Sequence, residues 1–117
     1  MNDREILVKS DRDPLCGHTR EGLAQAFREK LEGRVQAAYF FGSVADGRLN
    51  PHSDIDLILV QETDKPFLQR FEDFPDLYDI VPALDFLVYT PEEFARLTTN
   101  PTVGFWRSVT HSLQRFL

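Results

Sequence analysis

The sequence has little of several things, and each scarcity excludes a class of protein. A single cysteine, Cys16, excludes an intramolecular disulfide, so we expect a reducing compartment such as the cytoplasm. No apolar run approaches the length of a membrane span, and the first residues lack the charged-then-apolar order of a secretory leader. The 13 basic residues are outnumbered by 19 acidic ones, and no Lys/Arg stripe is present. We therefore expect no strong binding to nucleic acid through charge alone.

Length and composition indicate one globular domain with a short extension. The chain has 117 residues, of which 42% are hydrophobic, enough for a modest core. We place the domain at residues 19–117 and expect residues 1–18 to be a loosely attached helical turn or edge strand. Cys16 and His18 in this extension have no matching ligands elsewhere, so a metal site there is not expected.

The most informative stretch is a small-residue turn between two apolar segments. Residues 35–41 and 54–60 are rich in apolar and aromatic residues and are predicted to be sheet strands. Gly42-Ser43 follows the first strand, at a point where a backbone can bend sharply or let a ligand approach. The residues between the strands, 46–53, are mostly turn formers.

Two carboxylates lie at the start of the second predicted strand. Asp54 and Asp56 alternate with apolar residues, so an extended strand puts them on one face, roughly 6.5–7 Å apart along the chain. Like charges so close are costly unless a cation lies between them. A hard divalent metal such as Mg²⁺ suits these oxygen ligands. The alternative is a solvated strand end in which Asp54 caps the turn.

The order of these pieces resembles a known enzyme signature. Gly42-Ser43, ten further residues and then Asp54-Ile55-Asp56-Leu57 are similar to the signature of the nucleotidyltransferase superfamily that includes DNA polymerase β. The small size and the form Ser53-Asp54-Ile55-Asp56-Leu57 resemble its smallest branch, the minimal nucleotidyltransferases (MNT domains). The resemblance extends from about Thr19 to the last residue.

This resemblance implies an α/β (α+β) fold, a small mixed sheet with helices packed on it, and a site of three acids. A third carboxylate on a neighbouring strand completes the metal site of the family, and Asp85 in the predicted strand 83–89 has that place. Asp79 is the second choice, because Pro82 interrupts its segment. Together with Asp54 and Asp56, Asp85 would be catalytic and would hold Mg²⁺, with two ions expected and Mn²⁺ as an alternative. Otherwise Asp85 is an edge-strand acid that faces water.

The resemblance also assigns a nucleotide site to Gly42, Ser43 and Arg48. Small members of the family often have a basic residue shortly after the Gly-Ser pair, where this chain has Asp46. Arg48 is the nearest replacement, and Lys65 and Arg107 are candidates from elsewhere in the fold.

The implied reaction is transfer of a nucleoside monophosphate, AMP from ATP or another nucleotide, to a hydroxyl of a protein or small molecule. Minimal nucleotidyltransferases commonly pair with a helical HEPN protein, and in toxin–antitoxin pairs the MNT chain is the antitoxin. The alternative is a nucleotide-binding or catalytically weak module that neutralises its HEPN partner by complex formation. The chain has no room for a separate acceptor domain, so a partner or a second copy would supply the acceptor.

Helices are predicted around these strands. Residues 19–32 follow Thr19 as N-cap and precede Gly33. Residues 66–74 have aromatic residues at helical spacing, which we expect to be core. Thr90 and Glu93 form a capping box for a helix that ends by Asn100. A last helix starts at Asn100-Pro101, and its apolar stripe consists of Val103, Trp106, Val109 or Thr110, Leu113 and Leu117.

Overall fold

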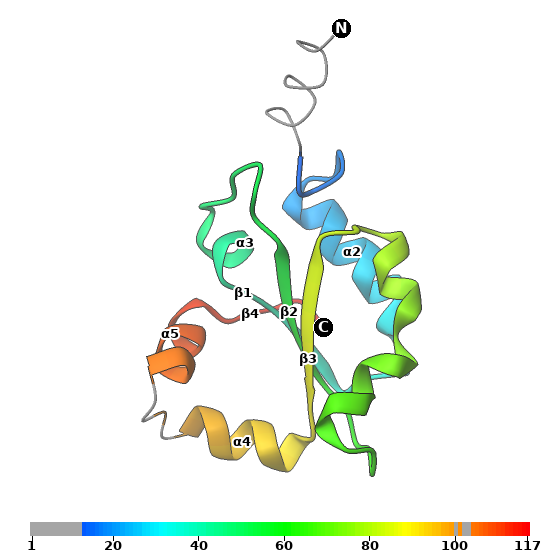
Figure 1. Cartoon of the computed structure of the whole chain (residues 1–117), viewed down its shortest axis with the longest axis vertical. Helices are drawn as coiled ribbons and strands as arrows, with labels where there is room; N and C mark the ends of the chain where they lie inside the picture. The colour runs from blue at the N-terminus through cyan, green and yellow to red at the C-terminus, as the bar shows by residue number, and fades with distance from the viewer. Residues whose placement is uncertain (1–12, 100, 102–103) are drawn as a thin grey trace, which may run out of the picture.

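The computed structural model describes residues 13–99, 101 and 104–117. A mixed four-stranded sheet lies between two layers of helices, which confirms the predicted fold class (Figure 1). Its strands are β1 (Ala37–Phe41), β2 (Ile55–Val60), β3 (Leu84–Tyr89) and β4 (Gln114–Arg115). The helices are α2 (Arg20–Leu31), α3 (Ser43–Asp46), the 3₁₀ helices η1 (Phe67–Asp73) and η2 (Pro75–Asp79), α4 (Pro91–Thr99) and α5 (Gly104–Ser112).

The sheet has the order β3-β2-β1-β4. β1 pairs antiparallel with both β2 and β4, whereas β2 and β3 run parallel. A parallel pair needs a long crossover connection, and the segment that holds η1 and η2 supplies it. This crossover brings the starts of β2 and β3 to the same end of the sheet.

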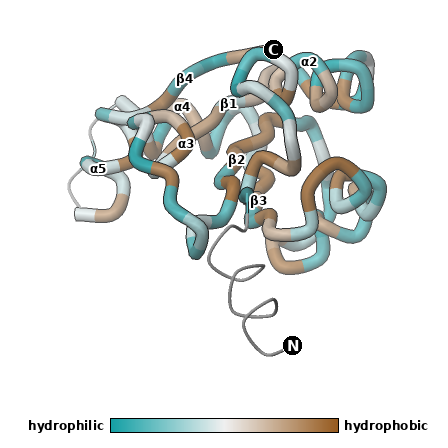
Figure 2. Tube along the Cα trace, turned by 90° about the horizontal axis from the view of Figure 1, so that it is seen from above, coloured by the Kyte–Doolittle hydropathy of each residue, from teal (hydrophilic) through white to brown (hydrophobic). Residues whose placement is uncertain are grey.

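One face of the sheet holds the larger core. α2 and the two 3₁₀ helices cover this face, to the right of the sheet in Figure 1. Hydrophobic residues follow β2 through the middle of the molecule (Figure 2). The fully buried side chains of this core include Leu23, Phe27, Leu57, Leu59 and Phe74. Their burial provides the main free energy of folding, at about 1.5–3 kcal/mol for each large side chain.

The opposite face is covered over only part of its length. Ile58 of β2 packs there against Trp106 and Val109 of α5, and partly buried aromatic side chains surround them. Asp56 and Asp85, nearer the start of their strands, are respectively half-buried and exposed. Because side chains alternate along a strand, both project on the same face as Ile58. The acidic end of this face therefore stays open to solvent.

The predicted helix starts are present. Thr19 Oγ1 accepts the N–H of Gly22 at 3.0 Å, and α2 ends one residue earlier than expected. Thr90 and Glu93 exchange side-chain-to-backbone hydrogen bonds of 2.9 and 3.2 Å, which confirms the capping box. Glu93 also binds the buried Arg70, and this hydrogen bond lowers the pKa of Glu93 to about 2. Through Glu93, the capping box therefore connects α4 to the crossover segment between β2 and β3.

The predicted helix over residues 66–74 is wrong in type and in burial. The segment forms the 3₁₀ helix η1, which ends at Asp73, and a second 3₁₀ helix, η2, begins at Pro75 just after it. A 3₁₀ helix has three residues per turn, so side chains spaced for an α-helix do not share one face. Phe74 is buried in the core, whereas Phe67 and Phe71 are exposed.

The last predicted helix is too long. α5 ends at Ser112, and residues 114–115 form β4 beside Tyr39 and Phe40 of β1. Phe116 then packs on Phe27 and Phe40, with ring centroids 6.1 and 4.5 Å apart. Pairing with the free edge of β1 and packing of Phe116 in the core stabilise this segment more than a longer helix would.

Some expectations fall outside the described residues, namely most of the extension (residues 1–12), Asn100 and Val103. Across the part of the chain that the structure describes, no helix is both long and apolar enough to cross a membrane.

Candidate active site

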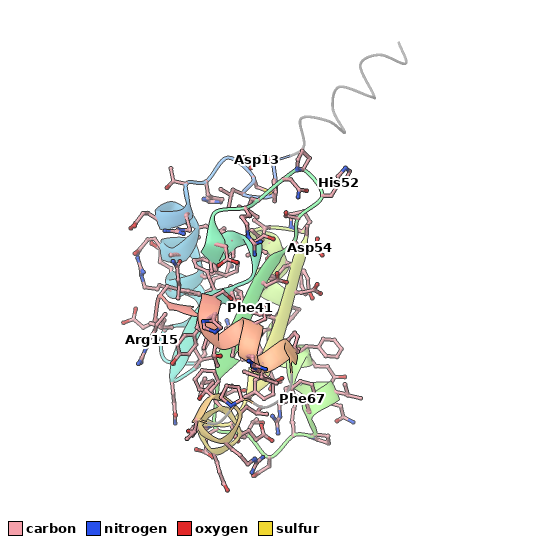
Figure 3. All side chains as sticks on the ribbon, turned by 90° about the vertical axis from the view of Figure 1, so that its left-hand side faces the viewer. Asp13, Phe41, His52, Asp54, Phe67 and Arg115 are labelled. Atoms are coloured by element: carbon pink, nitrogen blue, oxygen red, sulfur yellow. The ribbon has the colours of Figure 1, made fainter. Side chains whose placement is uncertain are left out.

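Two of the three predicted acids are direct neighbours across the sheet. The parallel register aligns Asp56 of β2 with Asp85 of β3. Asp54 lies just before β2, and its charge also acts on Asp56. Figure 3 shows Asp54 at one end of this face and Phe67 at the other. The three acids thus come from the same end of two parallel strands.

Gly42, at the end of the neighbouring strand β1, lies close to the same acids. It follows Phe41, which is paired with Asp56, and has φ 69° and ψ −145°, a conformation that only glycine adopts easily. A Cβ atom built on Gly42 would lie 2.7 Å from Oδ2 of Asp56. The absence of a side chain at Gly42 is therefore what lets the turn approach this carboxylate.

A short helix starts directly after this glycine. α3 begins at Ser43, and the N–H of Asp46 donates to the carbonyl of Gly42 at 3.0 Å. N–H groups in the first turn of a helix have no partner within the helix. At the other end, Arg20 donates to the carbonyls of Val44 and Ala45. The Gly42-Ser43 turn is therefore held between a strand and an anchored helical turn.

The electrostatics single out Asp56 among the three acids. Burial, then the charge of Asp85 and then that of Asp54 raise the pKa of Asp56 from 3.8 to about 6. A carboxylate that is half-buried beside two others binds either a proton or a cation more strongly than an exposed one does. This environment favours a bound cation near neutral pH.

Comparison with known proteins decides the family. The family model for the polymerase β nucleotidyltransferase domain matches residues 21–103, which include all three acids and the Gly42-Ser43 turn. The chain belongs to the polymerase β nucleotidyltransferase family. A crystal structure described as a "putative nucleotidyltransferase from Sulfolobus solfataricus" is similar, with 25% identity and a TM-score of 0.51. That match covers 63% of this chain and 69% of the other. Among curated proteins none matches.

Nucleotidyltransferase domains of this family generally depend on divalent metal, and the acids fit that requirement in part. Carboxylate oxygens are the right donors for Mg²⁺. In the described residues, however, no three His, Cys, Asp or Glu side chains gather closely enough to hold an ion by themselves. Mg²⁺ is usually held by one or two carboxylates plus substrate phosphates. The arrangement therefore suits a metal that arrives with a nucleotide.

The basic candidates of this nucleotidyltransferase lie in different places. Arg48 forms an ion pair with Asp46 of α3 at 2.6 Å, close to the turn. Lys65 pairs with Asp73 on the crossover at 2.7 Å, and Arg107 is exposed on α5. Asp79, the second choice for the third acid, is exposed at the end of η2. Of these four residues, only Arg48 is near the turn in sequence.

Sequence reasoning missed Ser112. The N–H of Gly42 donates to Oγ of Ser112 at 3.2 Å, across 70 positions of the chain. Ser112 is the last residue of α5, and its own hydroxyl reaches the carbonyl of Val109 at 3.2 Å. Nothing in the local pattern indicates this contact, because it depends on how α5 crosses the sheet. It fixes the Gly42-Ser43 turn to α5.

Ser112→Ala is expected to destabilise the nucleotidyltransferase by about 1 kcal/mol, since the part-buried Gly42 N–H loses its acceptor. The free energy of unfolding from urea titration measures this effect. Ser108→Ala, on an exposed position one turn earlier in α5, is the control. Equal unfolding free energies for the two variants would show that the Ser112 contact contributes nothing to stability.

Proposed function

We propose that this protein transfers AMP from ATP, or another nucleoside monophosphate, to a hydroxyl group. The observation that carries the proposal is the register of Asp56 with Asp85, next to a glycine that cannot carry a side chain without striking Asp56. Structural ion pairing does not account for the position of Asp56, because burial and the charges of Asp85 and Asp54 raise its pKa rather than lower it.

The proposed reaction is a substitution at the α-phosphorus. The acceptor oxygen forms a bond to the α-phosphorus, and the bond from that phosphorus to the oxygen bridging the α- and β-phosphates breaks. Pyrophosphate leaves with the electron pair of the broken bond, and the hydroxyl proton passes to a carboxylate. Asp85 is exposed at the sheet edge, where an acceptor can reach it, and we assign it this role.

The residues that would hold Mg²⁺, or Mn²⁺, are Asp54, Asp56 and Asp85. Two such ions supply charge neutralisation at the attacking and leaving oxygens when they are bound. Gly42 and Ser43 let the phosphates approach the backbone, and Arg48 adds a cation once it exchanges Asp46 for phosphate.

We propose that the acceptor hydroxyl belongs to a partner protein, a helical HEPN protein for which this chain is the antitoxin. The supporting observation is an exposed apolar group on η1, where the side chains of Phe67, Leu68 and Phe71 are 39%, 80% and 52% exposed. Exposed apolar residues that cluster are typical of protein interfaces. The same observation favours the second candidate, a module that neutralises its partner by binding alone.

The test is calorimetric titration of ATP into the protein with and without Mg²⁺. We expect binding only with Mg²⁺, and its loss in Asp54→Asn plus Asp56→Asn. Asp64→Asn plus Asp79→Asn removes two exposed acids and the same charge, and should bind as the unchanged protein does.

A transfer assay separates the enzyme from the binding module. ATP labelled at the α-phosphate is incubated with the protein and a co-expressed HEPN partner. Label on the partner, absent with the double Asp54 and Asp56 variant, supports the enzyme. A complex that forms equally well with that variant, without label, supports the module. Unchanged ATP binding by the variant would refute the assigned site.

A further inference from the structure

We infer a second binding site, for a phosphate group, between α2 and β4. A pocket of about 220 Å³ lies there, lined by Arg20 and Arg28 of α2, Arg115 of β4 and the neighbouring Gln114. In Figure 3, Arg115 lies at the edge of the molecule away from Asp54. Three arginines that share one pocket stand out in a chain with a net charge of −6.

The guanidinium groups of Arg20 and Arg28 have neutral partners. Arg20 donates to the carbonyls of Val44 and Ala45, and Arg115 donates to a main-chain oxygen of Leu117, the last residue of the sequence. Arg28 donates to the carbonyl of Phe116 and to the side-chain amide oxygen of Gln25. Each guanidinium has five N–H donors, so every one of them retains N–H groups that these contacts do not use.

Within the described part of the chain, no Asp or Glu side chain forms an ion pair with this cluster. The ion pairs recorded there involve other basic residues, such as Arg34 with Asp76 and Arg70 with Glu93. Among the side chains that line the pocket, Glu21 supplies one negative charge and the arginines supply three positive ones. Cations held close together repel one another, and an anion in the pocket removes that repulsion.

Phosphate is the anion that these groups suit best. Guanidinium groups bind phosphate oxygens through paired N–H donors, and the amide of Gln114 supplies a further donor on the pocket wall. The pocket includes Phe40, whereas the acids lie on the face of its neighbour Phe41. Successive residues of a strand point to opposite faces, so this pocket is separate from the proposed nucleotide site.

The experiment measures binding of inorganic phosphate, pyrophosphate and AMP by calorimetry in EDTA, which removes divalent metal. We expect binding of pyrophosphate and phosphate, weakened at least tenfold by Arg115→Gln. Arg115 is exposed and its one recorded contact is local, so this variant should fold normally, as urea unfolding will check. Arg96→Gln, on the exposed surface of α4, is the matched control and should bind normally.

Comparison of the ligands in this test shows whether the pocket binds a phosphate group alone or a nucleotide. AMP binding as weak as phosphate means that the pocket recognises the phosphate group alone, and tighter AMP binding means a nucleotide ligand. The Asp54→Asn plus Asp56→Asn variant should keep this binding, so failure of the proposed nucleotidyl transfer leaves the second site testable. Absence of binding without metal, or equal loss in Arg115→Gln and Arg96→Gln, would overturn the inference.

Discussion

Gly42→Ala is expected to reduce the proposed nucleotidyl transfer strongly and to destabilise the protein in the same variant. The new Cβ atom would lie 2.7 Å from Oδ2 of Asp56, closer than a carbon and a carboxylate oxygen can approach. The backbone conformation of Gly42 adds strain of about 1–3 kcal/mol for a residue with a side chain. Relief requires the turn or Asp56 to move, and a shift of about 1 Å in such a site costs about 100-fold in rate.

A second glycine provides the control for Gly42→Ala. Gly47 ends α3 with φ 72°, and a Cβ atom there meets nothing within 4 Å. Gly47→Ala should therefore lose about 1–2 kcal/mol from its backbone conformation and keep full activity. Label transfer from ATP and urea unfolding measure the two effects. Full activity in Gly42→Ala would mean that the close approach to Asp56 is not needed for the reaction.

Asp56→Asn is expected to make the metal-free protein more stable and to abolish the proposed nucleotidyl transfer. Burial and the charges of Asp85 and Asp54 raise the pKa of Asp56 to about 6, so its ionised form is unfavourable in the folded state. Because solvent screens part of the repulsion at this half-buried side chain, removing the charge should add only about 1–3 kcal/mol to the free energy of unfolding at pH 8 without metal. Such opposition between stability and activity is common at active sites.

The raised pKa of Asp56 determines how the stability of the metal-free protein changes with pH. The folded pKa of about 6 is above the value of 3.8 used for an unperturbed aspartate, so the folded state takes up the proton first as pH falls. Asp56 should therefore destabilise the metal-free protein fully above pH 6. The protein should regain that stability between pH 6 and about pH 4. In Asp56→Asn this gain should vanish.

Two comparisons make the Asp56 prediction decisive. Asp79→Asn removes an exposed acid and should change neither the stability nor its pH dependence. Mg²⁺ with ATP should raise the melting temperature of the unchanged protein and leave that of Asp56→Asn unaltered. A less stable Asp56→Asn variant in EDTA at pH 8 would contradict the proposed crowding of charge.

The strand–turn–strand geometry around Gly42 could be predicted from the sequence because its determinants are local. Gly42 and Ser43 directly follow β1, Asp54 directly precedes β2 and Asp56 lies on β2, which pairs with β1. The alternation of polar and apolar residues predicted that the two acids share one face of the strand. Capping preferences predicted that helices start after Thr19 and Thr90. Each of these features depends on residues that are near one another in the chain.

Contacts between distant segments were harder to predict. Asp85 was chosen on resemblance, and the structure places it both on an edge strand, exposed, and opposite Asp56. Ser112 and β4 were missed because each depends on a partner about 70 residues earlier, Gly42 for the hydroxyl and Tyr39 for the strand. Helical spacing alone also failed at Phe67 and Phe71, where the chain forms a 3₁₀ helix.

The parallel return of β3 has a consequence for how the protein acquires its charge cluster during folding. β1 and β2 are joined by a short connection, whereas 23 residues, 61–83, separate β2 from β3. Closing the longer loop loses more chain entropy, so we expect β3 to dock after the first two strands have paired. That late step adds Asp85 to Asp56 and increases the repulsion. A nascent chain therefore holds two acids and a glycine turn before its third acid arrives, and Mg²⁺ with a nucleotide should speed the completion of folding.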